Sequence, residues 1–290
     1  MRPLPNITVV TADLEGCRKM KTRIIAAVAL LPPLLVIVLA LPSIWTAVLF
    51  GLAAAVAAYE LLWGTGLVKH PRLIVYTAAM AFLVSIWGAL GQNYPAALIG
   101  VLLFAAVLYA EGLASKATLR YEKMAVCFAG GLLIPFMLTA LVRIHSGDEG
   151  RFFILIPFVL AFLSDTGAYF AGRAFGKHKL APVISPNKTV EGVVGGVVGA
   201  IVGMLIYGAV LDLAFGFTVN YGLAAAYGVL GSLAAVFGDL SFSAIKRQTG
   251  IKDYGNLIPG HGGILDRFDS MTVVAPLAEA LLILLPVAVK

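Results

Sequence analysis

A polar segment between two long apolar stretches of the sequence carries most of the side chains that could do chemistry. It runs from Ser243 to Asp269 and reads SAIKRQTGIKDYGNLIPGHGGILDRFD. Its charged and imidazole side chains are Lys246, Arg247, Lys252, Asp253, His261, Asp266, Arg267 and Asp269. A cluster of both signs at a membrane boundary is costly and therefore indicates a function. Because cations bind phosphate oxygens and aspartates bind Mg²⁺, the segment predicts a nucleotide-phosphate site.

Two shorter polar segments contain the same kinds of side chain. The first reads SDTGAY, begins at Ser164 inside an apolar stretch, and contains Asp165. The second reads SPNKTVEG and begins at Ser185. Its proline, asparagine and threonine are typical of a helix start, whose free N–H groups attract phosphate. The candidate substrate-binding residues of this second segment are Asn187, Lys188 and Thr189.

A carboxylate also lies inside the apolar stretch that precedes the long polar segment. Asp239, Ser243 and Lys246 have the spacing i, i+4, i+7, which places them on one face of a helix. Carboxylates within a membrane span usually mark a functional site. The alternative is a purely structural ion pair of Asp239 with Lys246 or Arg247.

Other ionisable residues have simpler interpretations. His261 lies between glycines without a second His or Cys cluster, so a phosphate or substrate contact is favoured over a zinc site. Basic residues at the end of a span often serve only as topology signals, which is the alternative for Arg173, Lys177 and Lys179. We interpret three glutamates without a surrounding polar motif as helix-packing or interfacial residues: Glu60, Glu111 and Glu279.

The composition defines the elements that must position these residues. Apolar residues make up 60% of the 290 residues and charged residues only 12%, and the mean hydropathy is +0.96. These values are typical of an all-α polytopic integral membrane protein, folded as one continuous helical bundle. Cys17 and Cys127 lie far apart in the sequence, so no disulfide framework is expected.

Apolar runs long enough to cross a bilayer predict about nine transmembrane helices. Their approximate ranges are 22–41, 43–63, 72–91, 94–112, 124–143, 152–172, 190–212, 222–245 and 270–289. We divide the chain into an N-terminal tail (1–21), N-terminal transmembrane helices (22–150) and C-terminal catalytic transmembrane helices with polar loops (151–290). The glycines of the seventh range have small-xxx-small spacing, which predicts close helix packing.

The basic residues predict the orientation of the bundle. With nine spans and a cytoplasmic N-terminus, all but three of the 21 Lys and Arg residues fall on the cytoplasmic side. The exceptions are Arg143, Arg151 and Lys290. All the conspicuous polar loops then face the cytoplasm, where nucleotides are. Met20 and Lys21 directly precede the first span, which raises the hypothesis that translation begins at Met20; an N-terminal mass measurement would test it.

The long polar segment resembles the signature of the phosphatidate cytidylyltransferase (CDP-diacylglycerol synthase) family. The matching pattern is S-x-x-K-R-x4-K-D-x-G-x2-I-P-G-H-G-G-I-x-D-R-F-D, from Ser243 to Asp269, without a departure. The S-D-T-G-A-Y and S-P-N-K-T-x-E-G segments resemble the family as well. The motifs extend from about Asp165 to the C-terminus, and before Asp165 the resemblance rests on hydropathy alone.

The resemblance implies the reaction of CTP with phosphatidate to give CDP-diacylglycerol and pyrophosphate. It implies Mg²⁺ as cofactor, and a monovalent cation is a second candidate ion. The implied first ligands of Mg²⁺ are Asp239 and Asp266, and the second choices are Asp165 and Asp269. The implied phosphate-holding residues are Lys188, Lys246, Arg247, Lys252, His261 and Arg267. Hydrogen bonds would come from Asn187, Thr189 and Ser243, and backbone approach from Gly262 and Gly263. We expect a homodimer in a bacterial cytoplasmic membrane, with membrane lipids but no nucleic acid as partners.

Three alternatives remain at this point. A lipid-alcohol kinase shares the cations and Mg²⁺ but needs a base for a neutral hydroxyl, a role open to His261. A transporter could use Asp165 and Asp239 along an ion path, although the polar residues concentrate on one side of the membrane. A structural membrane scaffold would not explain the segment from Ser243 to Asp269.

Overall fold

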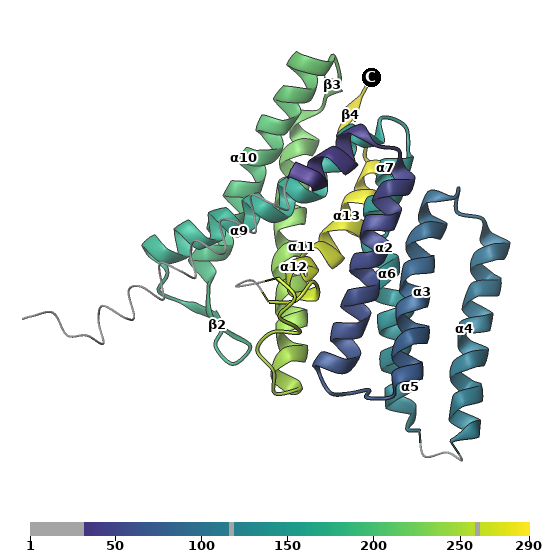
Figure 1. The fold of residues 1–290 in the computed structure, drawn as a ribbon. Helices are drawn as coiled ribbons and strands as arrows, with labels where there is room; N and C mark the ends of the chain where they lie inside the picture. The colour runs from purple at the N-terminus through teal and green to yellow at the C-terminus, as the bar shows by residue number, and fades with distance from the viewer. Residues whose placement is uncertain (1–31, 116–118, 259–261) are drawn as a thin grey trace, which may run out of the picture.

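The computed structural model describes residues 32–115, 119–258 and 262–290, which form a helical bundle (Figure 1). Seven helices in these ranges are long and apolar enough to cross a membrane, which confirms the predicted all-α membrane-type fold. They are α2 (Ser43–Tyr59) with its π-helical end η1 (Glu60–Gly64), α3 (Pro71–Ala89), α4 (Tyr94–Ala114), the run α5 (Tyr121–Phe128), η2 (Ala129–Leu133), α6 (Ile134–Leu138) and α7 (Ala140–Ser146), then α8 (Gly150–Phe153) with α9 (Leu155–Phe175), α10 (Val190–Phe215) and α11 (Tyr221–Gln248).

The first and last predicted spans differ from these seven. Residues 32–40 are helical, but most of the predicted span 22–41 and the whole tail 1–21 lie outside the described residues. The last predicted span contains α13 (Met271–Leu284), whose 14 residues extend roughly 21 Å, less than a hydrocarbon core of about 30 Å. The count of nine spans and the cytoplasmic N-terminus therefore stay predictions.

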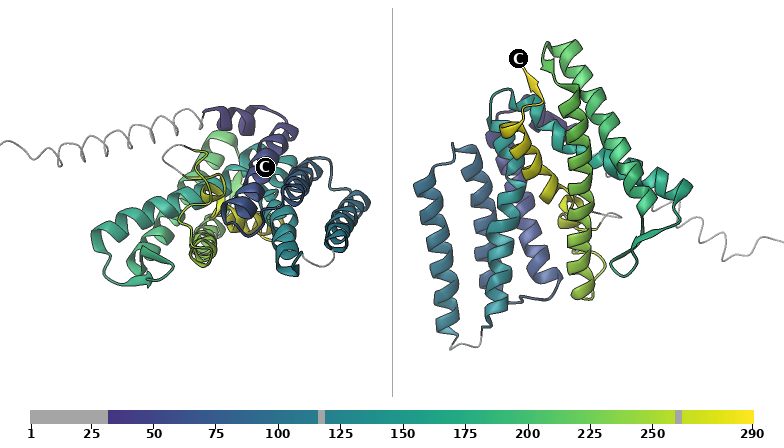
Figure 2. Two further views of the ribbon diagram at one scale, coloured as in Figure 1. Left: turned by 60° about the horizontal axis from the view of Figure 1, so that its bottom comes forward. Right: turned by 180° about the vertical axis from the view of Figure 1, so that it is seen from behind.

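The bundle has two unequal sides. Figure 2 shows α4 at one edge, beside α3, and the pair α9–α10 at the opposite edge, running obliquely to the other helices. The short helix α12 (Leu265–Phe268) lies between these sides and contacts α2, where the rings of Phe50 and Phe268 meet edge to face at 5.9 Å. The segment that carries Asp266 is thus held against a transmembrane helix from the other end of the sequence.

Close packing of α9 on α10 confirms the prediction from the glycine spacing. A Cβ atom added at Gly195 would overlap Ala171 of α9, and one at Gly199 would lie 2.6 Å from the Leu163 carbonyl oxygen. Along α10, the branched apolar side chains are exposed and suit lipid: Val194, Val198, Val202, Ile206 and Val210. Small residues inward and branched residues outward give this helix its orientation.

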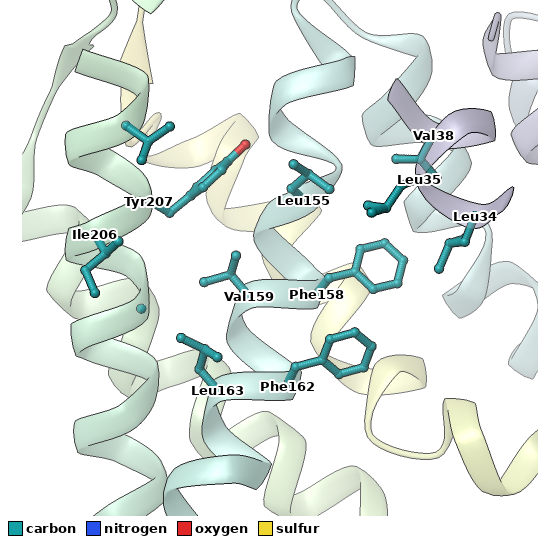
Figure 3. A pocket seen from close by; sticks show the side chains of 12 residues that line it. Leu34, Leu35, Val38, Leu155, Phe158, Val159, Phe162, Leu163, Ile206 and Tyr207 are labelled. Atoms are coloured by element: carbon teal, nitrogen blue, oxygen red, sulfur yellow. The ribbon is translucent and has the colours of Figure 1, made fainter. Parts of the chain in front are cut away.

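An apolar cavity lies between α9, α10 and the helical residues 34–38 (Figure 3). Its volume is about 430 Å³, and Phe158 and Phe162 project into it from α9. Tyr207 also lines the cavity, and its hydroxyl donates a hydrogen bond to the Phe152 carbonyl oxygen at 2.5 Å. The cavity walls therefore suit hydrocarbon.

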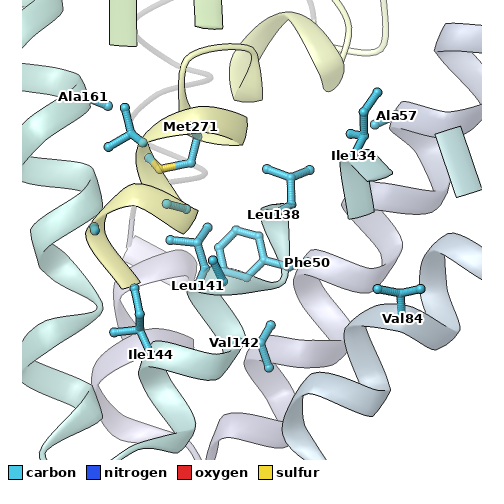
Figure 4. Close-up of a cluster of buried hydrophobic side chains, with 14 of the residues drawn as sticks. Phe50, Ala57, Val84, Ile134, Leu138, Leu141, Val142, Ile144, Ala161 and Met271 are labelled. Carbon is cyan, nitrogen blue, oxygen red and sulfur yellow. The ribbon is translucent and has the colours of Figure 1, made fainter. Parts of the chain in front are cut away.

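The buried core joins the remaining helices. Phe50 of α2, Val84 of α3, Leu138 of α6, Leu141 of α7 and Met271 of α13 come together there (Figure 4). These helices come from both ends of the sequence, so the two predicted groups of transmembrane helices share one core.

Two small antiparallel strand pairs were not predicted. β1 (Lys179–Ala181) pairs with β2 (Ser185–Thr189), with Lys179 opposite Thr189. β3 (Thr218–Val219) pairs with β4 (Ala288–Val289), at the end of the bundle where the C-terminus lies (Figure 1). The β1–β2 pair follows α9 and contacts α11 through the hydrogen bond of Arg247 to the Ile184 carbonyl oxygen. The β3–β4 pair joins the C-terminus to the loop before α11.

Arg143, one of the basic residues used to predict the orientation, lies in the protein interior. Arg143, predicted in an outer segment, lies in α7 with 8% of its surface exposed. Its Nε and Nη2 atoms donate to the two carboxylate oxygens of Glu279 at 2.6 Å each. Glu279 therefore has the helix-packing role expected from the sequence, and Arg143 is its partner.

Candidate functional site

The polar face of α11 is the first part of the site. Ser243 Oγ donates a hydrogen bond to Asp239 Oδ1 at 3.1 Å, one helical turn away, as the i, i+4 spacing predicts. Asp239 lies inside α11, which continues to Gln248, roughly 14 Å further along the axis. The carboxylate of Asp239 is thus carried by a rigid helix and not by a loop.

The β1–β2 pair brings Lys188 to this face. Lys188 Nζ lies 2.5 Å from Asp239 Oδ2, and both side chains are about a quarter exposed (24% and 27%). The structure therefore does not support the alternative of a structural ion pair between Asp239 and Lys246 or Arg247. Thr189, next to Lys188, caps α10 by accepting a hydrogen bond from the Gly192 N–H at 3.1 Å, which confirms the predicted helix start.

Lys246 joins α11 to α12. Its Nζ atom lies 2.8 Å from Asp266 Oδ1 and 4.0 Å from Asp269 Oδ2. Asp266 Oδ2 also accepts hydrogen bonds from the N–H groups of Tyr254 (2.8 Å) and Gly263 (3.0 Å). Because Asp266 is 5% exposed and has three donors, it anchors its own loop, and Oδ1 keeps one lone-pair direction for a further ligand.

Asp165 and Asp269 complete a group of four carboxylates. Asp165 on α9 is close enough to interact electrostatically with Asp239, Lys188 and Arg267. Burial raises the pKa of Asp269 to about 7, and the charge of Asp239 acts in the same direction. The Ser270 N–H, Lys246 and Arg267 lower that pKa. The site therefore sets four aspartates against three cations: Lys188, Lys246 and Arg267.

The other predicted site residues occupy more peripheral positions. Arg247 is exposed, and its guanidinium donates to the carbonyl oxygens of Ile184 (3.1 Å) and Ile251 (3.3 Å), which ties the β1–β2 turn to the loop after α11. Lys252 and Asn187 are exposed. His261 lies outside the described residues. Gly262 has φ +88°, a conformation that favours glycine, and its carbonyl oxygen accepts from the Ile258 N–H at 2.9 Å.

Glu60 is the residue of this region that sequence reasoning missed. It was interpreted as a helix-packing or interfacial residue, as Glu111 and Glu279 were. Glu111 has that role through contacts with Tyr76 (3.4 Å) and Arg72 (3.7 Å). The carboxylate of Glu60 instead accepts hydrogen bonds from the backbone just before Asp266. Its partners lie more than 200 residues away, so no local sequence pattern could have indicated them.

The donor set fits Mg²⁺ only with help from a ligand. Within the described residues, no three His, Cys, Asp or Glu side chains gather closely enough to hold a metal ion alone. Mg²⁺ usually uses one or two carboxylates together with substrate phosphates and waters. Asp239 and the free direction on Asp266 Oδ1 are carboxylate oxygen donors of the kind that Mg²⁺ prefers, so the chemistry of the donor set fits the ion.

Residues 21–285 match the model of the cytidylyltransferase family. The chain belongs to this family. The match includes the four aspartates and the three cations of the site, and it also includes the N-terminal helices, where the motif resemblance had rested on hydropathy alone.

Relatives of the chain point in the same direction. It is 47% identical over 139 residues to a phosphatidate cytidylyltransferase of Staphylococcus saprophyticus, covering 48% of this chain and 52% of the relative. It is 44% identical over 160 residues to one of Staphylococcus haemolyticus, covering 55% and 57%. For one of Staphylococcus aureus the identity is 45% over 139 residues, covering 48% and 52%. The chain thus spans about half the length of the curated relatives it matches.

Proposed function

We propose that this protein transfers a cytidylyl group from CTP to phosphatidate, giving CDP-diacylglycerol and pyrophosphate for phospholipid biosynthesis. The observation that carries the proposal is the convergence of Lys188–Asp239 and Lys246–Asp266 from separate elements at one polar site of a membrane bundle. Family membership and the names of the relatives support CTP and phosphatidate as the substrates.

The proposed reaction needs no general base. A phosphate monoester has a second pKa of about 6, so the lipid phosphate is largely a dianion at neutral pH and is itself a nucleophile. One of its oxygens attacks the α-phosphorus of CTP, a new P–O bond forms, and the bond to the bridging oxygen breaks. Pyrophosphate leaves with that electron pair. The protein's task is to orient two polyanions for in-line displacement.

The charges of the site support a divalent cation as cofactor. At the centre of the site, the three cations Lys188, Lys246 and Arg267 face four aspartates, so much of their charge is already offset before CTP and a lipid phosphate bind. Mg²⁺, when bound, would offset the charge of the phosphates and polarise the α-phosphate. We propose Asp239 and Asp266 as its first ligands and Asp165 and Asp269 as further ligands or as orienting groups for cations. A monovalent cation is a second candidate ion.

The remaining residues divide by their accessibility. Lys188 and Arg267 are solvent-accessible enough to contact phosphates, and Arg247, Lys252 and His261 are proposed to do the same from the periphery. Asn187 offers an exposed amide on β2. The hydroxyls of Thr189 and Ser243 already hold Gly192 and Asp239, so we propose that they position the site as well as meet the substrate. Gly262 and Gly263 allow close approach of the backbone.

The apolar cavity beside α9 supports lateral access for a lipid. Phe162 of the cavity wall and Asp165 of the site lie within one turn of the same helix. A lipid with its phosphate at Asp165 could therefore place acyl chains against the cavity (Figure 3). We propose that the site faces the cytoplasm of a bacterial cell and that the protein forms a homodimer.

The test is pyrophosphate release by the detergent-purified protein. Release should require CTP, phosphatidate and Mg²⁺ together, with CDP-diacylglycerol as the lipid product. Parallel reactions replace phosphatidate with diacylglycerol, or CTP with ATP. Phosphorylation of diacylglycerol would favour a lipid-alcohol kinase, and an absence of all turnover in lipid that supports other membrane enzymes would contradict the proposal.

A further inference from the structure

We propose that Glu60 is a positioning residue that holds the segment bearing Asp266 and Arg267 in its active geometry. The inference rests on the proposed function for its kinetic consequence but not for its structural one. Glu60 begins η1, the π-helical end of α2, and is 3% exposed. π-Helical turns within α-helices often occur at functional sites.

Both carboxylate oxygens of Glu60 are used by the distant segment. The Ile264 N–H donates to Oε1 at 2.9 Å, and the Leu265 N–H donates to Oε2 at 2.8 Å. A buried carboxylate is costly unless it is hydrogen-bonded, and these two bonds satisfy that requirement. They also fix the backbone one and two residues before Asp266.

The space around Glu60 is made by glycines of the same segment. A Cβ atom added at Gly255 would lie 2.6 Å from Glu60 Oε1, and one at Gly263 would overlap the carboxylate. On η1 itself, a Cβ atom at Gly64 would overlap the Tyr254 carbonyl oxygen. The end of α2 and the loop therefore meet backbone to backbone, with Glu60 between them.

Neighbouring residues of the same loop bind Asp266. Its Oδ2 atom accepts from the N–H groups of Tyr254 and Gly263, which are the neighbours of Gly255 and Ile264 around Glu60. Glu60 and Asp266 thus hold one backbone layer from two sides. Loss of the Glu60 bonds would loosen the backbone N–H groups of Tyr254 and Gly263, which donate to Asp266. Asp266 would then be held less firmly beside Lys246.

The experiment compares Glu60→Gln and Glu60→Ala with the wild-type protein and with Glu279→Gln. Glu279 is the matched control because it is also a largely buried glutamate with both oxygens engaged, but its partner Arg143 lies away from the site. Glutamine can accept only one of the two backbone bonds, and alanine accepts neither. Hydrogen–deuterium exchange of a peptide covering residues 262–268 is measured first, without substrates.

Exchange in residues 262–268 should rise about tenfold in Glu60→Gln and further in Glu60→Ala, since each lost bond leaves a buried donor without a partner. Glu279→Gln should leave this peptide unchanged. In the pyrophosphate assay, kcat should fall about tenfold or more in Glu60→Gln while KM for phosphatidate changes little.

Two results would overturn the proposal. One is unchanged exchange in residues 262–268 in both Glu60 variants, whatever the activity. The other is faster exchange there with wild-type kcat. If the wild-type protein releases no pyrophosphate, the proposed reaction fails, but the exchange measurement still decides whether Glu60 holds the segment.

Discussion

The two aspartates proposed as first metal ligands occupy unlike environments. Asp239 is about a quarter exposed and forms an ion pair with Lys188, which is similarly accessible. Asp266 is almost fully buried and accepts bonds from Lys246 and two backbone N–H groups. Asp239 can therefore meet a ligand directly, whereas Asp266 also holds the protein together. Substitution of each should separate these roles.

Replacement of Asp239 by Asn should abolish turnover and leave the fold intact. The amide removes a charge from the proposed metal site, for which we expect a loss of about 100-fold or more in kcat. Because the Lys188–Asp239 pair is partly open to solvent, the melting temperature should fall less than on loss of a fully buried pair. Pyrophosphate release and thermal unfolding in detergent measure the two effects. Activity above a few per cent of wild type would remove Asp239 from the ligands.

Replacement of Asp266 by Asn should cost stability as well as activity. The change leaves the buried Lys246 ammonium without its closest carboxylate, and loss of one partner of a buried pair costs about 3–5 kcal/mol. Thermal unfolding in EDTA keeps any contribution of Mg²⁺ out of the comparison. Asp239→Asn is the control in the same buffer. Equal melting temperatures for the two variants would contradict the anchoring role of Asp266.

At the scale of the elements, the spacing of residues predicted which side chains share a helix face, but it did not predict which distant elements come into contact. The i, i+4 relation of Asp239 and Ser243 and the glycine spacing of α10 follow from helix geometry, and the structure bears out both. The β1–β2 pair is too short to leave a sequence signal, yet it delivers Lys188. A local pattern specifies which face a residue occupies but not which element that face will meet.

The α9–α10 contact gives a prediction at this scale. Gly195→Ala should lower the melting temperature, because the added methyl group would overlap Ala171 in a tightly packed interface, and overpacking typically costs about 1–3 kcal/mol. Gly100→Ala in α4 is the matched control, since its nearest neighbour, the Met80 methyl carbon, would lie at an ordinary 3.7 Å. Thermal unfolding of both variants tests the difference. A Gly195 variant as stable as the Gly100 variant would mean that α9 and α10 are not in such close contact.

Over the whole molecule, the N-terminal and C-terminal helices form one unit around the site. Glu60 reaches the backbone before Asp266, and Arg143 reaches Glu279 across the core. These contacts join residues more than 130 positions apart in the sequence, so a hydropathy profile, which reports only on neighbouring residues, cannot predict them. The positive-inside rule likewise counted Arg143 as a loop charge because burial and pairing are not visible in a hydropathy profile.

The Arg143–Glu279 pair allows a last prediction about the whole bundle. Arg143→Met or Glu279→Met alone should lower the melting temperature strongly, since each leaves a buried charge unpaired at a cost of about 3–5 kcal/mol. The double variant should recover most of that loss, because an apolar pair of similar size often replaces a buried ion pair without penalty. It should also keep pyrophosphate release, since neither residue contacts the four aspartates of the site.

Arg72→Met is the control for a charge removed from the surface. The Arg72–Glu111 pair is 3.7 Å long and the arginine side chain is 78% exposed, so its loss should cost at most about 1 kcal/mol. If the double Met variant is no more stable than the single ones, the pair contributes more than mutual neutralisation. The bundle would then depend on the two hydrogen bonds, and on the one from Arg143 to the Phe136 carbonyl oxygen at 3.1 Å, to fix α7 against α13.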